Sequence, residues 1–388
     1  MSTIEQPDAA RIEAVAAAIA VNPVYENERL AELTHWGAPW ANLRVVVVGM
    51  GTSGDAVTDV LAQLGAKIVV IDGADTPEKR ERIEIYKNAY GPVEGLFGPE
   101  HMRALPLVDG QEPELVVTSP GVRPDHPVML DAYERRIQIW GDVELAWRLN
   151  ERSGLPTPKW LCLTGTNGKT TTVGMVDSIL KAAGKKAIQV GNVGMPIVYA
   201  IADDEPYEFF AVELSSFQLH WTHSMSPYAS VVLNIAEDHV DWHGSFERYK
   251  ADKARVYEHT QVACIFNTDH VDTLRMVENA DVIEGARAIG FSSTEMPAVS
   301  MLGLAEDIMV DRAFLKNRYN EAYELAVLED LAPAPGKMPA KHTVENALAA
   351  AALCRAADID PKAVGAGLRS FKTGAHRNQL VGYANDIM

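Results

Sequence analysis

The sequence predicts an α/β protein in which two domains, each built on a mainly parallel sheet, follow one another along the chain. Short apolar runs alternate with segments that repeat apolar residues at helical spacing, which is typical of βαβ units. Two of these runs lead directly into glycine-rich turns that open a helix. The length of 388 residues is sufficient for two or three domains.

The first domain is expected to follow an N-terminal extension, residues 1–41, that contains one helix. Its elements are the strand Leu43–Val48, the turn Gly49-Met-Gly-Thr-Ser-Gly54, a helix that ends at Gly65, the strand Lys67–Asp72, the strand Leu115–Thr118 with its turn to Gly121, the strand Ile137–Trp140 and the helix Asp142–Asn150. A glycine turn between a strand and a helix, with an acid at the end of the next strand, is typical of a Rossmann-like unit.

The second domain is predicted from Lys159 to about Phe371, after the linker Ser153–Pro158. Strands are expected at Trp160–Leu163, Ala187–Val190, Phe209–Leu214, Ser230–Asn234 and Val262–Asn267, and helices near 170–183, 245–259 and 343–358. Residues 280–340 are rich in single Gly and Pro residues, so we expect short strands and loops there.

The bulk properties exclude several classes of protein. A formal charge of −18 and a pI near 5.0 argue against nucleic acid as a partner. Three widely spaced cysteines among apolar neighbours predict buried thiols of a reducing compartment rather than disulfides or a metal site. No apolar run approaches the length of a membrane span, and the acidic start of the chain is unlike a signal peptide. We therefore expect a cytoplasmic protein with no membrane partner.

The most informative segment runs from Leu161 to Thr170 and reads Leu-Cys-Leu-Thr-Gly-Thr-Asn-Gly-Lys-Thr. Glycines free backbone N–H groups to point at phosphate oxygens at the start of a helix. Lys169 would then reach the β- and γ-phosphates, and the Thr170 hydroxyl would bind Mg²⁺. The spacing departs from the usual Walker pattern because Leu163 stands where the first glycine is expected. A chance Gly-Lys-Thr in a turn is the alternative.

Polar residues follow two later strands of the same predicted domain. Glu213 ends an apolar run, where a carboxylate is costly unless it is paired or binds a metal. It is interpreted as a metal ligand or γ-phosphate partner, with a buried ion pair as the alternative. His239 is either a ligand or part of a polar loop, and a lysine such as Lys253 is functional only if it turns inward to the phosphates.

The turn from Gly49 to Gly54 leaves three possibilities open. With Asp72 it could hold NAD, or it could hold the diphosphate of a nucleotide sugar, because the physics of the glycines and the helix N-terminus is the same. It could also be only a tight strand-to-helix turn.

Several motifs together resemble the bacterial Mur ligases. They are Thr164-Gly-Thr-Asn-Gly-Lys-Thr170, Gly191-Asn-Val-Gly194, Glu213-Leu-Ser-Ser-Phe-Gln-Leu219, Asn234-Ile-Ala-Glu-Asp-His239, Lys250-Ala-Asp-Lys253 and Asn346-Ala-Leu-Ala349. The Ser-Ser-Phe-Gln variant, with Thr118-Ser-Pro-Gly121, is most similar to the members that add D-glutamate to UDP-N-acetylmuramoyl-L-alanine. The resemblance covers about residues 42 to 380.

The resemblance implies an ADP-forming amide ligase of peptidoglycan synthesis that uses ATP and Mg²⁺. The substrate carboxylate would attack the γ-phosphate, and D-glutamate would attack the resulting acyl phosphate. The implied domains are an extension (1–41), a Rossmann-like UDP-substrate domain (42–152), a P-loop-type ATPase domain (153–373) and the start of a missing amino-acid-binding domain (374–388). A chain that ends there is expected to be poorly active, and it is expected to be a monomer.

The resemblance also implies roles for individual residues. Lys169, Glu213, His239 and Lys253 would be catalytic, and Thr170, Glu213, His239 and a carbamylated Lys253 would bind metal. ATP would contact Gly165, Thr166, Asn167, Gly168, Lys169, Thr170, Thr171, Asn346 and Arg377. The UDP-substrate would contact Thr52, Ser53, Asp72, Ser119, Gly121, Asn192, Ser215 and Gln218.

One departure puts an adenine-side contact in doubt, because His342-Thr343 stands where the family has His-Asn. Three alternatives remain: a related ligase with another amino acid or folate substrate, a nicotinamide-dependent dehydrogenase, and a non-catalytic nucleotide-binding module. The N-terminal Rossmann-like domain counts against a folate ligase, and no hydride-transfer site is evident.

Overall fold

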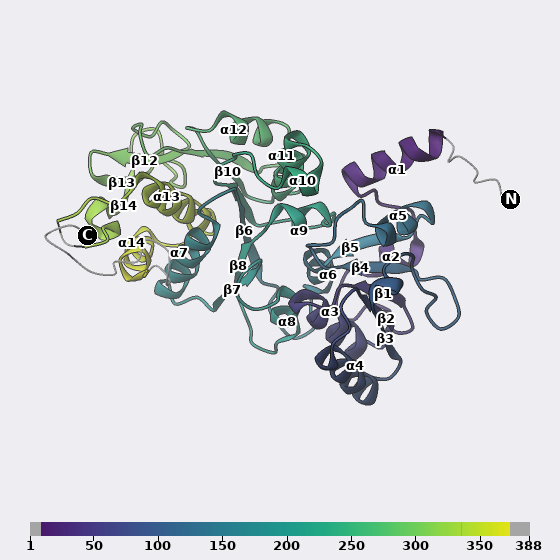
Figure 1. Ribbon diagram of the computed structural model, residues 1–388. Coiled ribbons are helices and arrows are strands. Elements are labelled where there is room, and N and C mark those ends of the chain that lie inside the picture. Colours follow the sequence, from purple (N-terminus) through teal and green to yellow (C-terminus); the bar gives the residue numbers. More distant parts are fainter. Residues whose placement is uncertain (1–8, 335, 373–388) are drawn as a thin grey trace, which may run out of the picture.

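The computed structural model describes residues 9–334 and 336–372, and its two sheets lie side by side (Figure 1). The first sheet is parallel throughout, with the order β3-β2-β1-β4-β5. Its strands are β1 (Arg44–Val48), β2 (Lys67–Asp72), β3 (Val93–Phe97), β4 (Leu115–Thr118) and β5 (Gln138–Gly141). The accompanying helices are α1 (Ala9–Val21), α2 (Glu28–Glu32), α3 (Thr52–Gln63), α4 (Pro77–Tyr90), the 3-10 turn Pro99–His101, α5 (Pro127–Glu134) and α6 (Asp142–Leu149).

The second sheet has nine strands in the order β14-β13-β12-β11-β10-β9-β6-β8-β7. They are β6 (Lys159–Thr164), β7 (Ala187–Gly191), β8 (Phe209–Glu213), β9 (Ala229–Val232), β10 (Ala263–Asn267), β11 (Arg287–Phe291), β12 (Met301–Ala305), β13 (Ile308–Asp311) and β14 (Tyr323–Val327). Strands β6 to β12 pair in parallel with their neighbours, whereas β12, β13 and β14 form an antiparallel meander.

The helices divide between the two faces of the second sheet (Figure 1). On the face away from the first sheet lie α7 (Lys169–Ala182), α13 (Lys341–Ala356) and α14 (Pro361–Ser370), and the last two pack against α7. Helices α8 (Ile197–Ala202) and α9 (Ser216–His220) lie between the sheets. They are followed along the chain by α10 (Val240–His243), α11 (Phe246–Ala254) and α12 (Val271–Glu278). The 3-10 turns are Arg255–Tyr257 and Leu328–Leu331.

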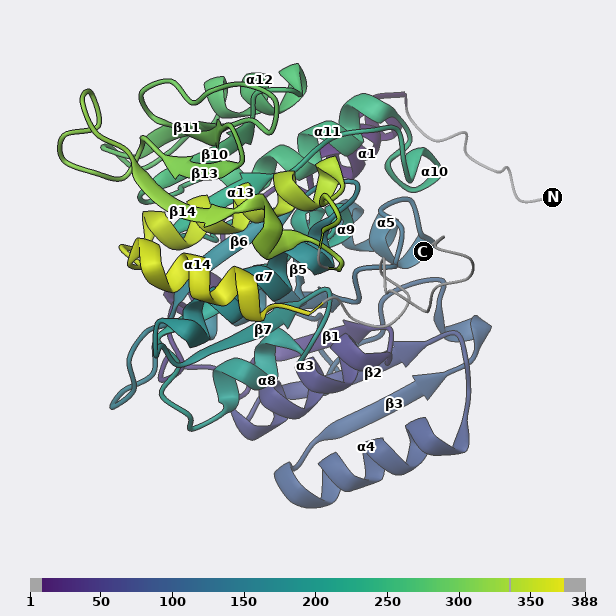
Figure 2. The same ribbon diagram turned by 90° about the vertical axis from the view of Figure 1, so that its left-hand side faces the viewer.

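One of the hydrophobic clusters contains apolar side chains from both sheets, so the two sheets pack against each other. Trp160 of β6 makes an edge-to-face contact with Trp147 of α6, with ring centroids 5.1 Å apart, and its Nε1 donates to Asn150 Oδ1 at 2.9 Å. Helix α8 also lies beside α3 (Figure 2), where Tyr199 donates to Asp59 at 3.0 Å. These contacts place the two sheets relative to each other.

The predicted mixed α/β class with mainly parallel sheets is confirmed. Strand β1, for example, follows from a valine run that is buried on both faces, as parallel strands are when helices cover the sheet. Within residues 280–340 the short strands are real and extend the second sheet. All three cysteines are buried free thiols. No helix in the described part of the chain is long and apolar enough to cross a membrane. The expected start of a further domain at 374–388 lies outside the described residues.

Candidate active site

The loop between β6 and α7 has the geometry of a phosphate cradle. Gly165 and Gly168 adopt φ values of +156° and +84°, which side chains disfavour, and Gly168 is the N-cap of α7. A Cβ atom at Gly168 would lie 2.4 Å from Oδ1 of Asn346, on helix α13. The φ value and the nearby Asn346 side chain therefore both favour glycine at position 168. Asn346, a predicted ATP contact, lies against the loop.

Reciprocal hydrogen bonds hold the loop in this shape. The backbone N–H of Asn167 donates to Asn234 Oδ1 at 2.9 Å, and Asn234 Nδ2 donates back to the Asn167 carbonyl at 3.1 Å. The hydroxyl of Thr166 accepts from the N–H of Ala236 at 2.9 Å and lies 2.9 Å from the hydroxyl of Tyr249. The segment after β9 thus orders the loop without any ligand.

Lys169 opens α7 and folds back over the loop. Its Nζ donates to the carbonyl oxygens of Gly165 at 2.9 Å and Thr166 at 3.0 Å. Thr170 and Thr171 follow on the first turn and are partly exposed. The positive end of the helix dipole, the backbone N–H groups of the first turn and the Lys169 ammonium make this turn a site for an anion.

Lys253 of α11 reaches the same loop from the other side. Its Nζ donates to the carbonyl of Gly165 at 2.9 Å and to Thr164 Oγ1 at 3.2 Å, and its side chain is buried. Burial, together with repulsion from Lys169, lowers the pKa of Lys253 to about 7. The lysine therefore turns inward, and a large share of it is a neutral amine near neutral pH.

Glu213 ends β8 beside the loop, since it pairs in register with Leu163 of β6. The carboxylate is buried at 1 % exposure, and its Oε1 accepts from Asn192 Nδ2 at 3.0 Å. Its Oε2 has no hydrogen-bond partner among the described residues. A buried carboxylate oxygen without a donor is a site for a cation, and carboxylate oxygen is the ligand that Mg²⁺ prefers. Glu213 therefore fits a Mg²⁺ ligand.

The structure does not join His239 to Glu213 in a ready-made metal site. His239 has φ +51° before α10, its side chain is half-exposed, and its ring lies 4.8 Å from that of Phe217. Across residues 9–334 and 336–372 no group of three or more His, Cys, Asp and Glu side chains has a metal-binding arrangement. Mg²⁺ commonly takes one or two carboxylates and completes its shell with water and phosphate, so an incomplete protein shell is compatible with it.

The first-sheet turn is closely packed where it bends and open where it faces outward. A Cβ atom at Gly54 would lie 1.8 Å from the carbonyl oxygen of Gly49, and one at Gly49 would lie 2.7 Å from Ser119 Oγ. Ser119 Oγ itself donates to the Gly49 carbonyl at 3.1 Å. At Gly51 and Gly121, by contrast, no atom stands within 4 Å of such a Cβ. Helix α3 begins at Thr52 on this open face, and the N-terminus of the helix can accept an anion there.

Asp72 uses its carboxylate to hold this turn together. Its oxygens accept from the N–H groups of Met50 at 2.7 Å and Ala74 at 2.8 Å, and Lys79 Nζ lies 2.6 Å away. Burial raises the pKa of Asp72, but the hydrogen bonds and the Lys79 charge outweigh it and lower the pKa below its usual value. In a dinucleotide site this acid would hold a ribose hydroxyl. Here three donors already contact it, and they hold the end of β2 against the glycine turn.

Two family models match the chain: the MurD-like Mur ligase N-terminal domain over residues 43–141 and the Mur ligase middle domain over residues 163–354. The UDP-N-acetylmuramoylalanine–D-glutamate ligase of Leifsonia xyli subsp. xyli is 45% identical over 365 residues, which are 91% of this chain and 69% of that protein. The chain belongs to the Mur ligase family. The enzyme of the same name from Streptomyces avermitilis is 45% identical over 341 residues, which are 87% of this chain and 69% of that enzyme.

A solved Mur ligase has the same fold. It is the UDP-N-acetylmuramate:L-alanyl-gamma-D-glutamyl-meso-diaminopimelate ligase from Neisseria meningitides, with a TM-score of 0.51 and 14% identity. The match covers 86% of this chain and 99% of that one.

Two predicted substrate residues of this Mur ligase shape the start of α9. Ser215 is the N-cap, and its hydroxyl accepts from the N–H of Gln218 at 3.2 Å. Gln218 Oε1 in turn accepts from the Ser215 N–H at 3.2 Å, which completes a capping box. The side-chain NH₂ of Gln218 is left to donate to Asp142, at 3.4 Å. Asp142 is a contact that the sequence analysis missed.

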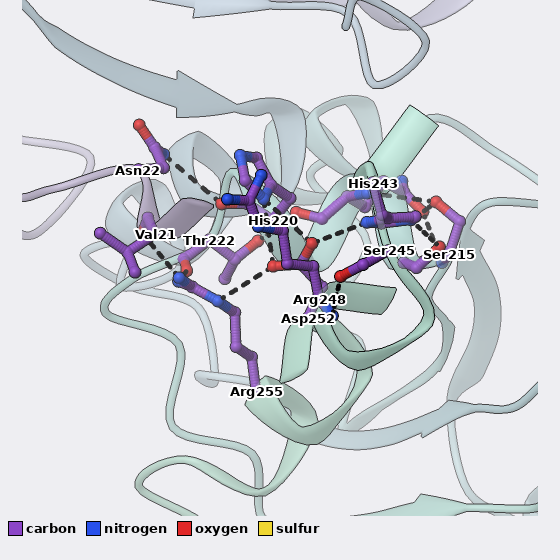
Figure 3. Close-up of polar contacts among 12 residues, drawn as sticks. Val21, Asn22, Ser215, His220, Thr222, His243, Ser245, Arg248, Asp252 and Arg255 are labelled. Carbon is purple, nitrogen blue, oxygen red and sulfur yellow. Dashed lines mark hydrogen bonds and ion pairs between the residues drawn. The ribbon is translucent and has the colours of Figure 1, made fainter. Parts of the chain in front are cut away.

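A buried polar network connects the helices that carry or adjoin the site residues (Figure 3). It could not be predicted from the sequence. Asp252, next to Lys253, lies 3.0 Å from His220 Nδ1 and 2.8 Å from His243 Nδ1, while His243 Nε2 lies 2.9 Å from Ser216 Oγ. Burial raises the pKa of Asp252, but the two histidines lower it below the usual value overall. The network ties α9, α10 and α11 together, and these helices carry or adjoin Ser215, His239 and Lys253.

The same network reaches the N-terminal segment. Arg255 lies 3.5 Å from Asp252 and donates to the carbonyls of Thr222 at 3.1 Å and Val21 at 2.7 Å (Figure 3). Asn22 lies beside it and donates to the His220 carbonyl at 3.5 Å. The end of α1 is therefore attached to Arg255, the residue that follows α11, which carries Lys253.

Proposed function

We propose that this chain catalyses the ATP-dependent joining of D-glutamate to UDP-N-acetylmuramoyl-L-alanine, a step of peptidoglycan synthesis. The observation that carries the proposal is buried Glu213, which pairs in register with the strand that leads into the phosphate loop and whose Oε2 has no partner within the described part of the chain. Relatives that are 45% identical and named for this reaction support the choice of substrates. The dehydrogenase and the non-catalytic module have no comparable support.

In the proposed reaction the substrate carboxylate attacks the γ-phosphorus of ATP, and ADP leaves with the bridging oxygen. The amine of D-glutamate then attacks the acyl phosphate, loses a proton and expels inorganic phosphate. Lys169 would neutralise charge on the transferring phosphoryl group, and the loop N–H groups would hold the phosphates in line. The loop residues from Gly165 to Thr171, with Asn346, would contact ATP. Arg377, also expected to do so, lies outside the described residues.

Mg²⁺, when bound, would supply positive charge that neutralises the phosphates. Thr170 and Glu213 would hold one ion, and His239 would help to hold a second. Lys253 would contribute as a carbamate, formed when its neutral amine adds to CO₂ and releases a proton. The pKa of about 7 supports this role, because only the unprotonated amine is a nucleophile.

The nucleotide end of the substrate would lie on the first sheet and its acyl end on the second. Thr52, Ser53, Asp72, Ser119 and Gly121 would surround the uridine and diphosphate. Asn192, Ser215 and Gln218 would line the muramoyl-alanine end. On this assignment residues 42–152 form the substrate domain and 153–373 the ATPase domain, and buried free thiols favour a cytoplasmic location.

Calorimetric titration with UDP-N-acetylmuramoyl-L-alanine, with UDP and NAD as controls, tests the assignment. We expect the sugar nucleotide to bind more tightly than UDP, and NAD not to bind. ADP release that depends on both the sugar nucleotide and D-glutamate would then measure whether these 388 residues complete the reaction. Binding of NAD alone would contradict the proposal.

A further inference from the structure

Asp142 joins the two halves of the proposed substrate site. It is the first residue of α6, and its Oδ2 accepts from Ser53 Oγ at 2.9 Å and from Gln218 Nε2 at 3.4 Å. Its Oδ1 accepts from the N–H of Val143 at 3.0 Å. This one oxygen of a buried side chain thus connects the glycine turn of the first sheet to the cap of α9, between the sheets.

Only a carboxylate satisfies all the donors around this position. An ionised Asp is an acceptor at both oxygens, and three donors point at it. Burial raises the pKa of Asp142 overall, and the hydrogen bonds from Ser53 and Gln218 offset only part of that rise. A role at the helix N-terminus alone needs neither Ser53 nor Gln218. The bonds across the two sheets therefore call for a separate explanation.

The connection continues on both sides of the carboxylate. Gln218 cannot reverse its amide without losing the acceptor that caps Ser215, so its NH₂ stays directed at Asp142. Beside it, the N–H of Gly141 donates to the carbonyl of Trp221 at 3.0 Å, which joins β5 to the end of α9. Ser53, Asp142, Gln218 and Ser215 thus form one unbroken chain of hydrogen bonds.

We propose that Asp142 is a positioning residue that fixes the spacing between the diphosphate-binding turn and the Ser215 end of the site. The proposal rests on the proposed function, because it concerns how one sugar nucleotide meets both sheets. A ligand that spans both sheets needs the spacing, whereas a ligand held only by the first sheet does not. Loss of Asp142 should therefore lower the affinity for a ligand that spans both sheets more than the affinity for a shorter ligand.

The test is calorimetric titration of the full 388-residue chain and its Asp142→Asn variant with UDP-N-acetylmuramoyl-L-alanine and with UDP. Asparagine has one acceptor oxygen and could keep both bonds across the sheets only by turning its NH₂ group toward the N–H of Val143, so at least one of the three donors loses its partner. We expect affinity for the sugar nucleotide to fall about tenfold and affinity for UDP to change less than about twofold. Asp142→Glu, which keeps both acceptors but displaces them, should show the same discrimination if the asparagine variant does not fold.

Glu144→Gln is the matched control. Glu144 is a buried carboxylate on the same helix, but it accepts from the N–H groups of His223 and Ser224 at 2.7 and 2.9 Å. The proposal is overturned if Asp142→Asn weakens both ligands equally, if it weakens neither, or if Glu144→Gln discriminates between them to the same extent. Failure of the unaltered chain to bind the sugar nucleotide would instead overturn the proposed function, and this inference with it.

Discussion

Nζ of Lys253 lies 2.9 Å from the carbonyl oxygen of Gly165, the first glycine of the phosphate loop. Lys169 donates to the same carbonyl at 2.9 Å, so two lysines converge on one backbone oxygen. Their mutual repulsion adds to the burial that lowers the pKa of Lys253. The loop therefore lies against two lysines, and one of them, Lys253, changes its charge near neutral pH.

The stability of the chain should depend on pH through Lys253. The unfolded lysine has an ordinary pKa of 10.5 and the folded one a pKa of about 7, so between these values the unfolded state binds the extra proton. The cost of burying the charge is fully present below pH 7 and is relieved as the pH rises toward 10.5. Lys253→Met should remove this dependence.

Urea denaturation at about pH 6.5 and about pH 8.5, in metal-free and CO₂-free buffer, measures the effect. We expect the unaltered chain to gain stability relative to Lys253→Met at the higher pH. Parallel changes in the two proteins would show that Lys253 keeps an ordinary pKa.

Lys169→Ala should lower the affinity for ATP at least about tenfold, because a charge-assisted contact to phosphate is lost. Lys181→Ala is the control, since Lys181 lies on the last turn of the same helix and pairs with Asp177. Calorimetric titration with ATP and Mg²⁺ compares the two variants. Equal affinities would remove Lys169 from the phosphate site.

Glu213→Gln should abolish the part of ATP affinity that depends on Mg²⁺. Glutamine can still accept from Asn192, but it carries no charge for the cation. Titrations with ATP at high and low Mg²⁺ measure this difference, and Glu208→Gln, just before the start of the same strand, is the control. If the Mg²⁺ dependence survives in Glu213→Gln, the ion is held elsewhere.

Asp252→Ala should destabilise the fold by about 3 kcal/mol, since it leaves His220, His243 and Arg255 without their shared carboxylate. Arg248→Ala alters an exposed side chain on the same helix and should change the free energy of unfolding by less than about 0.5 kcal/mol. Urea denaturation provides both values. A small effect of Asp252→Ala would mean that the network contributes little to holding α11.

Much of this architecture is local and therefore predictable from sequence. The valine run of β1 and the apolar run of β6 specify buried strands without reference to the rest of the chain. The spacing of Gly165, Gly168 and Lys169 likewise specifies the shape of the loop. Where a motif encodes backbone geometry, the expectation and the structure agree.

Contacts between distant segments could not be predicted in the same way. Asp142 meets Ser53 and Gln218 across 89 and 76 residues, and no periodicity relates those positions. The antiparallel meander of β12 to β14 was expected only as short strands and loops, because single Gly and Pro residues obscure the pattern. His239 was placed by its motif, but its half-exposed position against Phe217 depends on the tertiary fold.

The contact between Gly168 and Asn346 bears on how the protein is made. The phosphate loop forms early in the chain, yet one of its walls belongs to helix α13, which is synthesised only after β7 to β14. Domains generally fold in order of synthesis, from the N-terminus. A nascent chain that has released the first sheet and the loop therefore still lacks one wall of the proposed ATP site, and nucleotide can help the second sheet to fold only after α13 has been synthesised.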